Sequence, residues 1–489
     1  MNPSLPPYLA PARSFSDAPN TARRRRTRHL GSLASVAALA LALSACAPSA
    51  PGAGSGGGEG PASGTAEGSA GATDAAASAD PAEPVNAAQG DSRAEVASLA
   101  PRVVISHEGG LVTLDGETGE VVHEEELQGF LRLNNAGDGQ HVMVTHGDRF
   151  EVYNTGIDAQ GHGDHFHYYE STPGLSGITF DAPHAGHVVM HNGLTTLFAD
   201  GDGSIQTFTS EHLKDGQPRT ETASTDAPHH GVALELVDGS LLTTQGTEEA
   251  RDTVQVLGGE GEDVAAETND CTGVHGEAAA APNENGDVVV LGCEDGPVIY
   301  RDGEFHKVAA QSVYQRTGNL AGSEDSPIVL GDLKTEADAE FERPTQVALI
   351  NSLTDELQTV ELGSSYWFRS LARGPEGEAL VLTYDGELTV IDEETGEVTA
   401  EIPAIEAWEE HEEWQQPGPI LKTAGSMAYV TDAANQQLVV IDLEAGEVVN
   451  EVDLDVTPVE MAVVDGHPEA PEHEAGAGHE EEGHEGHDH

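Results

Sequence analysis

A 45-residue recurrence constrains this chain more than any other feature of its sequence. The segments DAPHAGHVV (181–189), DAPHHGVAL (226–234) and CTGVHGEAA (271–279) repeat one motif at that interval. Each copy opens a short β-rich segment, and a repeat of this length is typical of one four-stranded blade of a β-propeller. Because the first strand of each blade lines the central channel, we expect the histidines at the start of these strands to converge.

The residue pattern from Pro101 onward indicates an all-β fold. Short runs of Val, Leu, Ile, Phe and Tyr alternate with polar residues, and DG, NG and TG turns interrupt them every ~8–12 residues. The first strands of successive repeats are predicted to start near Leu131, Gly186, Gly231, Gly276, Leu320, Leu371, Ile420 and Val459. This count predicts an eight-bladed propeller, with seven blades as the alternative.

The two ends of the repeat region are predicted to share one blade. The last repeat, 459–466, runs directly into a His- and Glu-rich tail and lacks partner strands of its own. The first β-rich segment, 102–127, supplies the missing strands. Closing the ring in this way removes the open sheet edges that otherwise promote aggregation.

The N-terminus resembles a bacterial lipoprotein signal peptide. Arg23 to Arg26 form a basic region, Leu33 to Leu43 an apolar region, and LSAC ends at Cys46. A membrane anchor is the alternative, but a bilayer-spanning helix needs about 20 apolar residues. We therefore predict a signal peptide over 1–45, lipidation of Cys46, a disordered tether over 46–100, a propeller over 101–466 and a tail over 467–489. This predicts a protein outside the cytoplasm, anchored by lipid to the outer face of the cell membrane.

The charge of the chain restricts its partners. The 86 Asp and Glu against 21 Lys and Arg give a net charge of −65, which excludes nucleic acid because its phosphates would be repelled. Cations are the natural ligands of such a chain, and a merely solvated acidic surface is the alternative.

Two cysteines remain after Cys46. Cys271 and Cys293 form an even pair in a chain predicted to lie outside the cytoplasm, which favours a disulfide. Zinc ligation by the two thiolates is the alternative, and it requires a reducing compartment.

Three histidine clusters are candidate metal sites, because neutral imidazole is a common metal ligand and zinc takes three or four donors from separate segments. The strand order predicts that six histidines share the channel mouth, namely His107, His146, His184, His229, His230 and His275. The segment HGDHFHYY supplies a second set, namely His162, Asp164, His165 and His167. The tail supplies a third, suited to weak, fast metal capture, namely His467, His473, His479, His484, His487 and His489. Structural histidines at turns, and a solvated tail, are the alternatives.

Enzyme signatures are missing from the sequence. It contains no GxSxG elbow, no HExxH, no phosphate-binding glycine loop and no CxxCH haem site. The low aromatic share of 4% also argues against a sugar-stacking cleft. We therefore predict that the protein is not an enzyme.

Several segments together resemble the zinc metallochaperones called AztD. They are DHFHYY (164–169), PHHG (228–231), VHGEA (274–278) and WQQPGP (414–419), together with the two cysteines. The resemblance implies an eight-bladed propeller that binds Zn²⁺ and passes it to the solute-binding protein of an ABC zinc importer without catalysing a reaction. It also implies that the DHFH and channel-mouth histidines hold the zinc.

The choice of zinc rests on this resemblance, since imidazole and carboxylate donors alone favour copper. The chain departs from the family pattern in its C-terminal histidine tract and in LAGSEDSP (320–327), which has no histidine. A monomer is expected. A non-enzymatic lipoprotein that serves as a protein-binding scaffold is the alternative function.

Overall fold

A computed structural model describes residues 93–163, 165–259, 263–339 and 341–468. Strands dominate this part of the chain, and its one helical element is the short 3₁₀-helix η1 (Ser210–Asp215). No helix within these ranges has the length and apolar character needed to span a bilayer. The predicted signal peptide, Cys46, most of the tether, Asp164 and the tail histidines beyond His467 lie outside the described residues.

Eight antiparallel sheets of four strands form most of the described chain. Four of them come from its first half and its very end. Their strands, in sheet order, are β35 (Glu460–Val464), β2 (Arg102–His107), β3 (Gly110–Asp115) and β4 (Val121–Glu126); β5 (Arg132–Asn135), β6 (His141–Thr145), β7 (Arg149–Asn154) and β10 (Gly174–Asp181); β11 (Ala185–His191), β12 (Leu194–Ala199), β13 (Ser204–Thr209) and β14 (Glu221–Ser224); and β15 (Ala233–Glu235), β16 (Leu241–Gln245), β17 (Thr253–Leu257) and β18 (Val264–Thr268).

The other four sheets follow in chain order. Their strands are β19 (Glu277–Asn283), β20 (Gly286–Leu291), β21 (Val298–Arg301) and β22 (Glu304–Lys307); β23 (Leu320–Ala321), β24 (Ile328–Asp332), β25 (Gln346–Asn351) and β26 (Glu356–Glu361); β27 (Leu371–Arg373), β28 (Ala379–Leu382), β29 (Glu387–Ile391) and β30 (Val398–Pro403); and β31 (Leu421–Ala424), β32 (Met427–Asp432), β33 (Gln437–Asp442) and β34 (Glu447–Asp453).

The burial of each strand follows its place in its sheet. Inner strands such as β6 and β28 are buried along their whole length, as expected for strands covered on both faces. Fourth strands such as β34 alternate between exposed and half-buried positions, so only one face packs on the protein. The buried clusters lie between neighbouring sheets, for example where Ile105 and Met461 pack with Tyr429 and Leu438.

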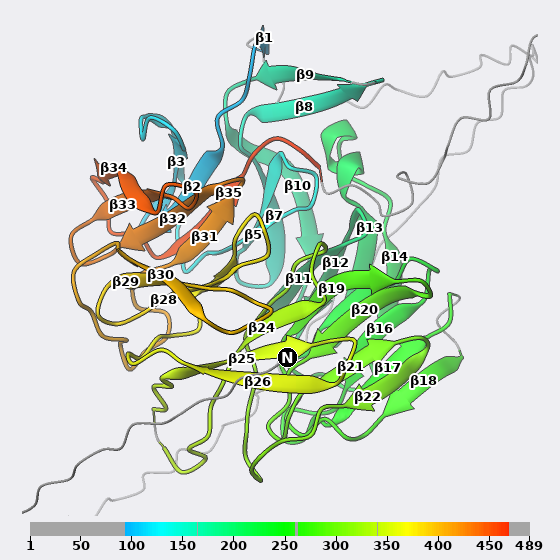
Figure 1. The fold of residues 1–489 in the computed structure, drawn as a ribbon. Helices are drawn as coiled ribbons and strands as arrows, with labels where there is room; N and C mark the ends of the chain where they lie inside the picture. The colour runs from blue at the N-terminus through cyan, green and yellow to red at the C-terminus, as the bar shows by residue number, and fades with distance from the viewer. Residues whose placement is uncertain (1–92, 164, 260–262, 340, 469–489) are drawn as a thin grey trace, which may run out of the picture. The chain divides into compact units, whose positions relative to one another are not determined.

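Each four-stranded sheet packs against the next in chain order, and the last, β31–β34, packs against β35 of the first. The strands β2 and β35 pair in antiparallel register from Arg102↔Val464 to Ser106↔Glu460. They lie side by side in Figure 1, blue beside orange, although they come from opposite ends of the described chain. The predicted pairing of the terminal segments is therefore present.

A ninth, three-stranded sheet stands outside this series. It consists of β1 (Ala94–Val96), β9 (His165–Glu170) and β8 (Ile157–His162). The hairpin β8–β9 is inserted between β7 and β10, which are themselves paired. The predicted tether extended to residue 100, and the structure places β1 within its last residues because these pair with the free edge of β9.

Candidate functional site

Two groups of three histidines bring their ring nitrogens within 4.8 Å of one another in the described ranges. His187, His230 and His275 form the group that we call the inter-sheet group. His162, His165 and His167 form the hairpin group. The two groups differ in how the chain positions them and in how far solvent reaches them.

The inter-sheet group is assembled by the starts of three consecutive sheets. His187 lies in β11, His230 precedes β15, and His275 precedes β19. The pairing of β11 with β12 shifts register between Ala185 and Val188, and such irregularities re-aim a side chain. Residues 45 and 88 positions apart in the sequence therefore meet because equivalent strand starts lie next to one another.

Hydrogen bonds fix the orientation of two of these rings. His230 Nδ1 lies 2.6 Å from Asp200 Oδ2, and His275 Nδ1 lies 2.7 Å from the carbonyl oxygen of Gly318. An ionised carboxylate and a carbonyl can only accept, so Nδ1 carries the proton in both rings. The two Nε2 atoms, 3.3 Å apart, then turn their lone pairs toward each other. Metal-binding histidines are commonly held this way by an acceptor behind the ring.

His187, in β11, completes the group. Its ring centroid lies 4.9 Å from that of His230 and 5.9 Å from that of His275. Its Nδ1 lies 3.6 Å from Glu277 Oε2, at the first residue of β19. That carboxylate oxygen is buried and has no hydrogen-bond partner within the described residues. A cation among the three rings would therefore have a carboxyl group close by.

Burial sets the protonation of this group. Desolvation, with the neighbouring His230 and Arg132, lowers the pKa of His187 to about 3. Desolvation, with the neighbouring His187, lowers the pKa of His275 to about 3. Desolvation also raises the pKa of Glu277 to about 8. At neutral pH the imidazoles of His187 and His275 are therefore uncharged, which is the form that binds a metal.

The hairpin group is built by one β-turn. His162 ends β8 and pairs across the turn with His165, the first residue of β9. His167 lies two residues further, on the same face of the strand as His165. The ring centroids lie 5.0 to 5.7 Å apart, and His165 Nε2 lies 3.3 Å from His167 Nε2. Glu95 of β1 places its Oε1 2.9 Å from His167 Nδ1, in the role that Asp200 has for His230.

Solvent reaches the hairpin group more freely than the inter-sheet group. The side chain of His167 is 40% exposed, whereas that of His187 is 15% exposed. Three donors in an exposed hairpin allow ligands to enter and leave without any rearrangement of the core. The hairpin group is therefore suited to exchange, and the inter-sheet group to retention.

The first tail histidine lies against the same hairpin. The ring of His467 meets the rings of Phe166 and Tyr168, with centroids 5.1 and 5.9 Å apart. Phe166 and Tyr168 alternate with the hairpin histidines along β9, so His467 lies on the opposite face of the strand. The chain consequently enters its tail next to the hairpin group.

A disulfide braces the inter-sheet group. Cys271 and Cys293 are bonded, with Cα atoms 5.0 Å apart. It joins the loop that precedes β19 to the end of β20, and both cysteines are buried. The bridge begins four residues before His275, so it restrains the loop that carries this ring.

The structure does not bring the other predicted channel-mouth histidines into either group. His229 is buried, with its ring nitrogens near Ala227 O and Thr244 Oγ1, so it is held inside the protein. His184 adopts a left-handed φ of 49° in the turn before β11. Their roles as ligands stay predictions without support from this geometry.

His107 is the last residue of β2 and His146 directly follows β6, so they lie in two other sheets. The Nδ1 of His146 is 2.7 Å from Glu151 Oε1, and the Nδ1 of His107 is 3.0 Å from Glu108 O. Their roles as ligands also stay predictions, and these contacts are compatible with the alternative of a hydrogen-bonded structural histidine.

Sequence reasoning missed the residue that completes the inter-sheet group. His187 falls within the first copy of the recurring motif, two residues after Ala185. Simple alternation along the strand does not indicate it, because the register of β11 shifts between Ala185 and Val188. Glu277 lies in the third copy of the motif, two residues after His275, but its approach to His187 depends on the packing of two sheets. Asp200 and Glu95 carry no local signal, because Asp200 meets His230 across two sheets and Glu95 reaches His167 through the pairing of β1 with β9.

Comparison with known proteins supports this architecture. No protein-family model matches the chain. A protein named zinc chaperone AztD, from Citrobacter koseri, is 23% identical over 378 residues, which cover 74% of this chain and 86% of that protein. Two solved structures of Citrobacter koseri AztD, one of them the apo form, match with TM-scores of 0.65 and 0.64 at 20% and 21% identity. Each match covers 75% of this chain and 98% of the other. The chain shares their fold, and the predicted resemblance is confirmed.

Proposed function

We propose that this protein is an extracytoplasmic zinc metallochaperone, which binds Zn²⁺ and passes it to the solute-binding protein of an ABC zinc importer. The observation that carries the proposal is the inter-sheet group, in which two imidazole Nε2 atoms face each other at 3.3 Å with acceptors behind both rings. Its similarity to a protein named as a zinc chaperone supports zinc as the metal.

We further propose that the eight four-stranded sheets are the blades of a closed propeller. The packing of each sheet on the next, and the pairing of β2 with β35, support this arrangement. The inner strands of neighbouring blades then surround one axis. Side chains at their starts converge there, which accounts for the meeting of His187, His230 and His275.

The inter-sheet group suits storage and release of zinc. Zinc prefers four donors in a tetrahedron, and sites with three protein ligands keep the fourth position open. A group that offers three imidazoles can retain zinc while an incoming donor from another protein takes the open position. The neutral state of His187 and His275 means that zinc need not displace protons from them.

The hairpin group and the tail would supply capture and hand-over. Exposed donors exchange metal quickly, and the tail joins the fold beside the hairpin at His467. The tail histidines, His473, His479, His484, His487 and His489, would raise the local supply of zinc. Only the coordination bonds of the zinc ion are exchanged in this cycle and no covalent bond changes, so the proposed role is that of a carrier anchored at Cys46 and not of an enzyme.

Zinc titration of the full chain tests the proposal. The His230→Ala/His275→Ala chain and the His165→Ala/His167→Ala chain are compared with the wild type by competition with a chromophoric chelator. We expect the first pair to remove the tightest site and the second to remove a weaker one. Zinc-loaded protein should then transfer zinc to the solute-binding protein faster than it releases zinc to the free chelator. Unchanged binding in both variants would leave a scaffold role in its place.

A further inference from the structure

A cavity of about 530 Å³ adjoins the inter-sheet group. Residues of the strands β11, β15, β19 and β23, and of the turn after β23, line it. Its polar lining residues include His191, Glu277, Glu324 and Asp325, and neither lysine nor arginine is among the lining residues. The cavity therefore favours cations and disfavours anions.

Strand register places the two ends of the cavity well apart. Glu277 is the first residue of β19, and the bridge Ala280↔Ser323 sets the turn with Glu324 three residues further along. At ~3.3 Å per residue the separation along the strand is about 10 Å. The cavity thus reaches from Glu277, beside the inter-sheet group, to an acidic turn beside the middle of β19.

His191 is a prepared ligand in the cavity wall. Its side chain is 3% exposed, and its Nε2 lies 2.9 Å from Asp287 Oδ1. Asp287 is held in turn by Asn192 and by the amide of Val237. Because the carboxylate can only accept, Nε2 carries the proton and Nδ1 keeps its lone pair. This buried Nδ1 has no hydrogen-bond partner within the described ranges.

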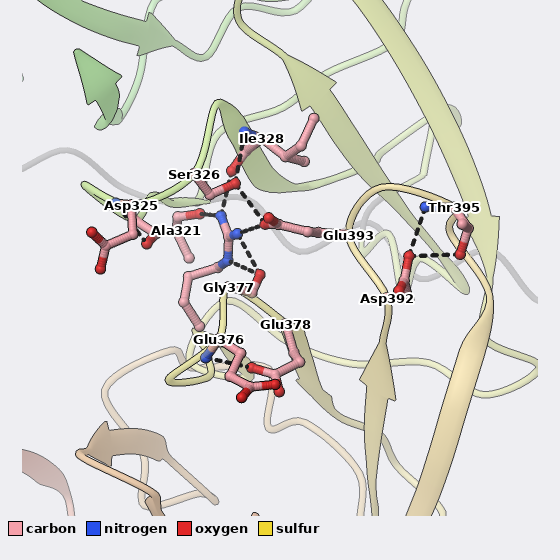
Figure 2. Close-up of polar contacts among 12 residues, drawn as sticks. Ala321, Asp325, Ser326, Ile328, Glu376, Gly377, Glu378, Asp392, Glu393 and Thr395 are labelled. Atoms are coloured by element: carbon pink, nitrogen blue, oxygen red, sulfur yellow. Dashed lines mark hydrogen bonds and ion pairs between the residues drawn. The ribbon is translucent and has the colours of Figure 1, made fainter.

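Hydrogen bonds to neighbouring strands hold the acidic turn of Glu324 and Asp325 in place. The buried Arg373 bonds to Glu393 and to the carbonyl oxygens of Ala321 and Ile328, and Glu393 accepts a 2.7 Å hydrogen bond from Ser326. Figure 2 shows Ser326 and Glu393 facing each other, with the Asp325 carboxylate directed away from them. The charge of Asp325 is therefore not neutralised by the arginine that anchors its turn.

Glu324 is close enough to His191 for the two side chains to interact electrostatically. Desolvation raises the pKa of the Glu324 carboxyl, and the nearby His191, when it is protonated, lowers it. The cavity therefore offers, in order, two exposed carboxylates, one buried imidazole nitrogen and the unpartnered oxygen of Glu277.

We infer that this cavity is a second passage for zinc, which connects the Glu324–Asp325 turn to the inter-sheet group through His191 and Glu277. This inference rests on the proposed function. The donors along the path are too few at any point to compete with three imidazoles, so zinc would pause there only transiently. A passage of this kind lets zinc enter or leave the inter-sheet group by way of the acidic turn, about 10 Å along β19 from Glu277.

Stopped-flow zinc exchange on the full chain tests the passage, with zinc ions and a chromophoric chelator as the only probes. The kinetic phase of the inter-sheet group is identified as the one that His230→Ala/His275→Ala abolishes. We examine Glu324→Gln/Asp325→Asn, His191→Gln, which keeps a donor toward Asp287, and Ala279→Leu, which fills the cavity. The control is Glu444→Gln/Glu447→Gln, which removes the same charge from the turn between β33 and β34 and from the first residue of β34.

A change in the passage alters the free-energy barrier to zinc entry and exit, and it does not alter the inter-sheet group that finally holds the zinc. We therefore expect each cavity variant to slow association and dissociation equally, by roughly tenfold, with Kd unchanged. The control should exchange as fast as the wild type. Wild-type rates in all three cavity variants would overturn the passage alone. If instead His230→Ala/His275→Ala binds zinc like the wild type, the proposed function itself fails.

Discussion

Replacement of Asp200 by asparagine tests whether the acceptor behind His230 prepares the inter-sheet group for zinc. The carboxylate lies 2.6 Å from His230 Nδ1, which keeps the ring proton on Nδ1 and the Nε2 lone pair available. An asparagine amide in this position can donate to Nδ1 and move the proton to Nε2, where it blocks the metal. Loss of such an acceptor costs roughly 10–100-fold in metal affinity.

The solvent exposure of Asp200 and His230 decides how large the loss of zinc affinity is within this range of roughly 10–100-fold. The His230 side chain is 34% exposed and that of Asp200 23% exposed, so solvent screens part of the interaction. We expect the lower end, about tenfold, which corresponds to about 1.4 kcal/mol of binding free energy.

The assay is a chelator competition at pH 7 in a full chain that also carries His165→Ala and His167→Ala, so that the hairpin group does not contribute. Asp202→Asn is the matched control, because Asp202 lies in the same turn and, within the described part of the chain, accepts a hydrogen bond only from the amide of Ser204. If Asp200→Asn and Asp202→Asn both bind within twofold of the parent chain, the orientation argument for His230 is refuted.

Three further predictions concern protons, the disulfide and the hairpin. Because burial lowers the pKa of His187 and His275 to about 3, both stay neutral as the pH falls to 5.5. Zinc binding at the inter-sheet group at pH 5.5 should therefore release at most two protons. Calorimetry in buffers of different ionisation enthalpy measures the number of protons released, and a value of three would contradict the prediction. Cys271→Ala/Cys293→Ala removes a crosslink with a sequence separation of 22, so the free energy of unfolding measured in urea should fall by about 3 kcal/mol. An unchanged urea midpoint would show that the disulfide adds no stability. Glu95→Ala should weaken zinc at the hairpin group by roughly 10-fold or more and leave the inter-sheet group unchanged; equal effects on both would contradict the assignment of Glu95 to the hairpin.

The sequence predicts the sheet pattern well because it depends on local periodicity. The predicted first-strand starts near Leu131, Leu320 and Ile420 correspond to β5, β23 and β31, which begin at Arg132, Leu320 and Leu421. Turn residues and alternating apolar residues specify these boundaries within a few positions. The pairing of 102–127 with the last strand was also predictable, since the final repeat has no partners of its own.

The composition of the site was less predictable because it depends on side-chain direction. The recurrence indicated His230 and His275, but a register shift in β11 selects His187 instead of His184. Asp200 and Glu277 approach the rings through sheet packing, which no sequence motif encodes. The hairpin was predicted as a cluster from its local spacing, whereas its contact with Glu95 depends on a strand in the predicted tether.

The pairing of β2 with β35 has a consequence for the order of folding. Arg102 meets Val464 only after nearly all of the described chain has been synthesised, so this contact has a high sequence separation and forms slowly. The sheets that carry the inter-sheet group need only residues 185–307 and can assemble earlier. Until β35 arrives, β2 presents an unpaired edge to other chains. Premature termination before Glu460 would therefore leave intact histidine-bearing sheets on a chain that is prone to aggregate.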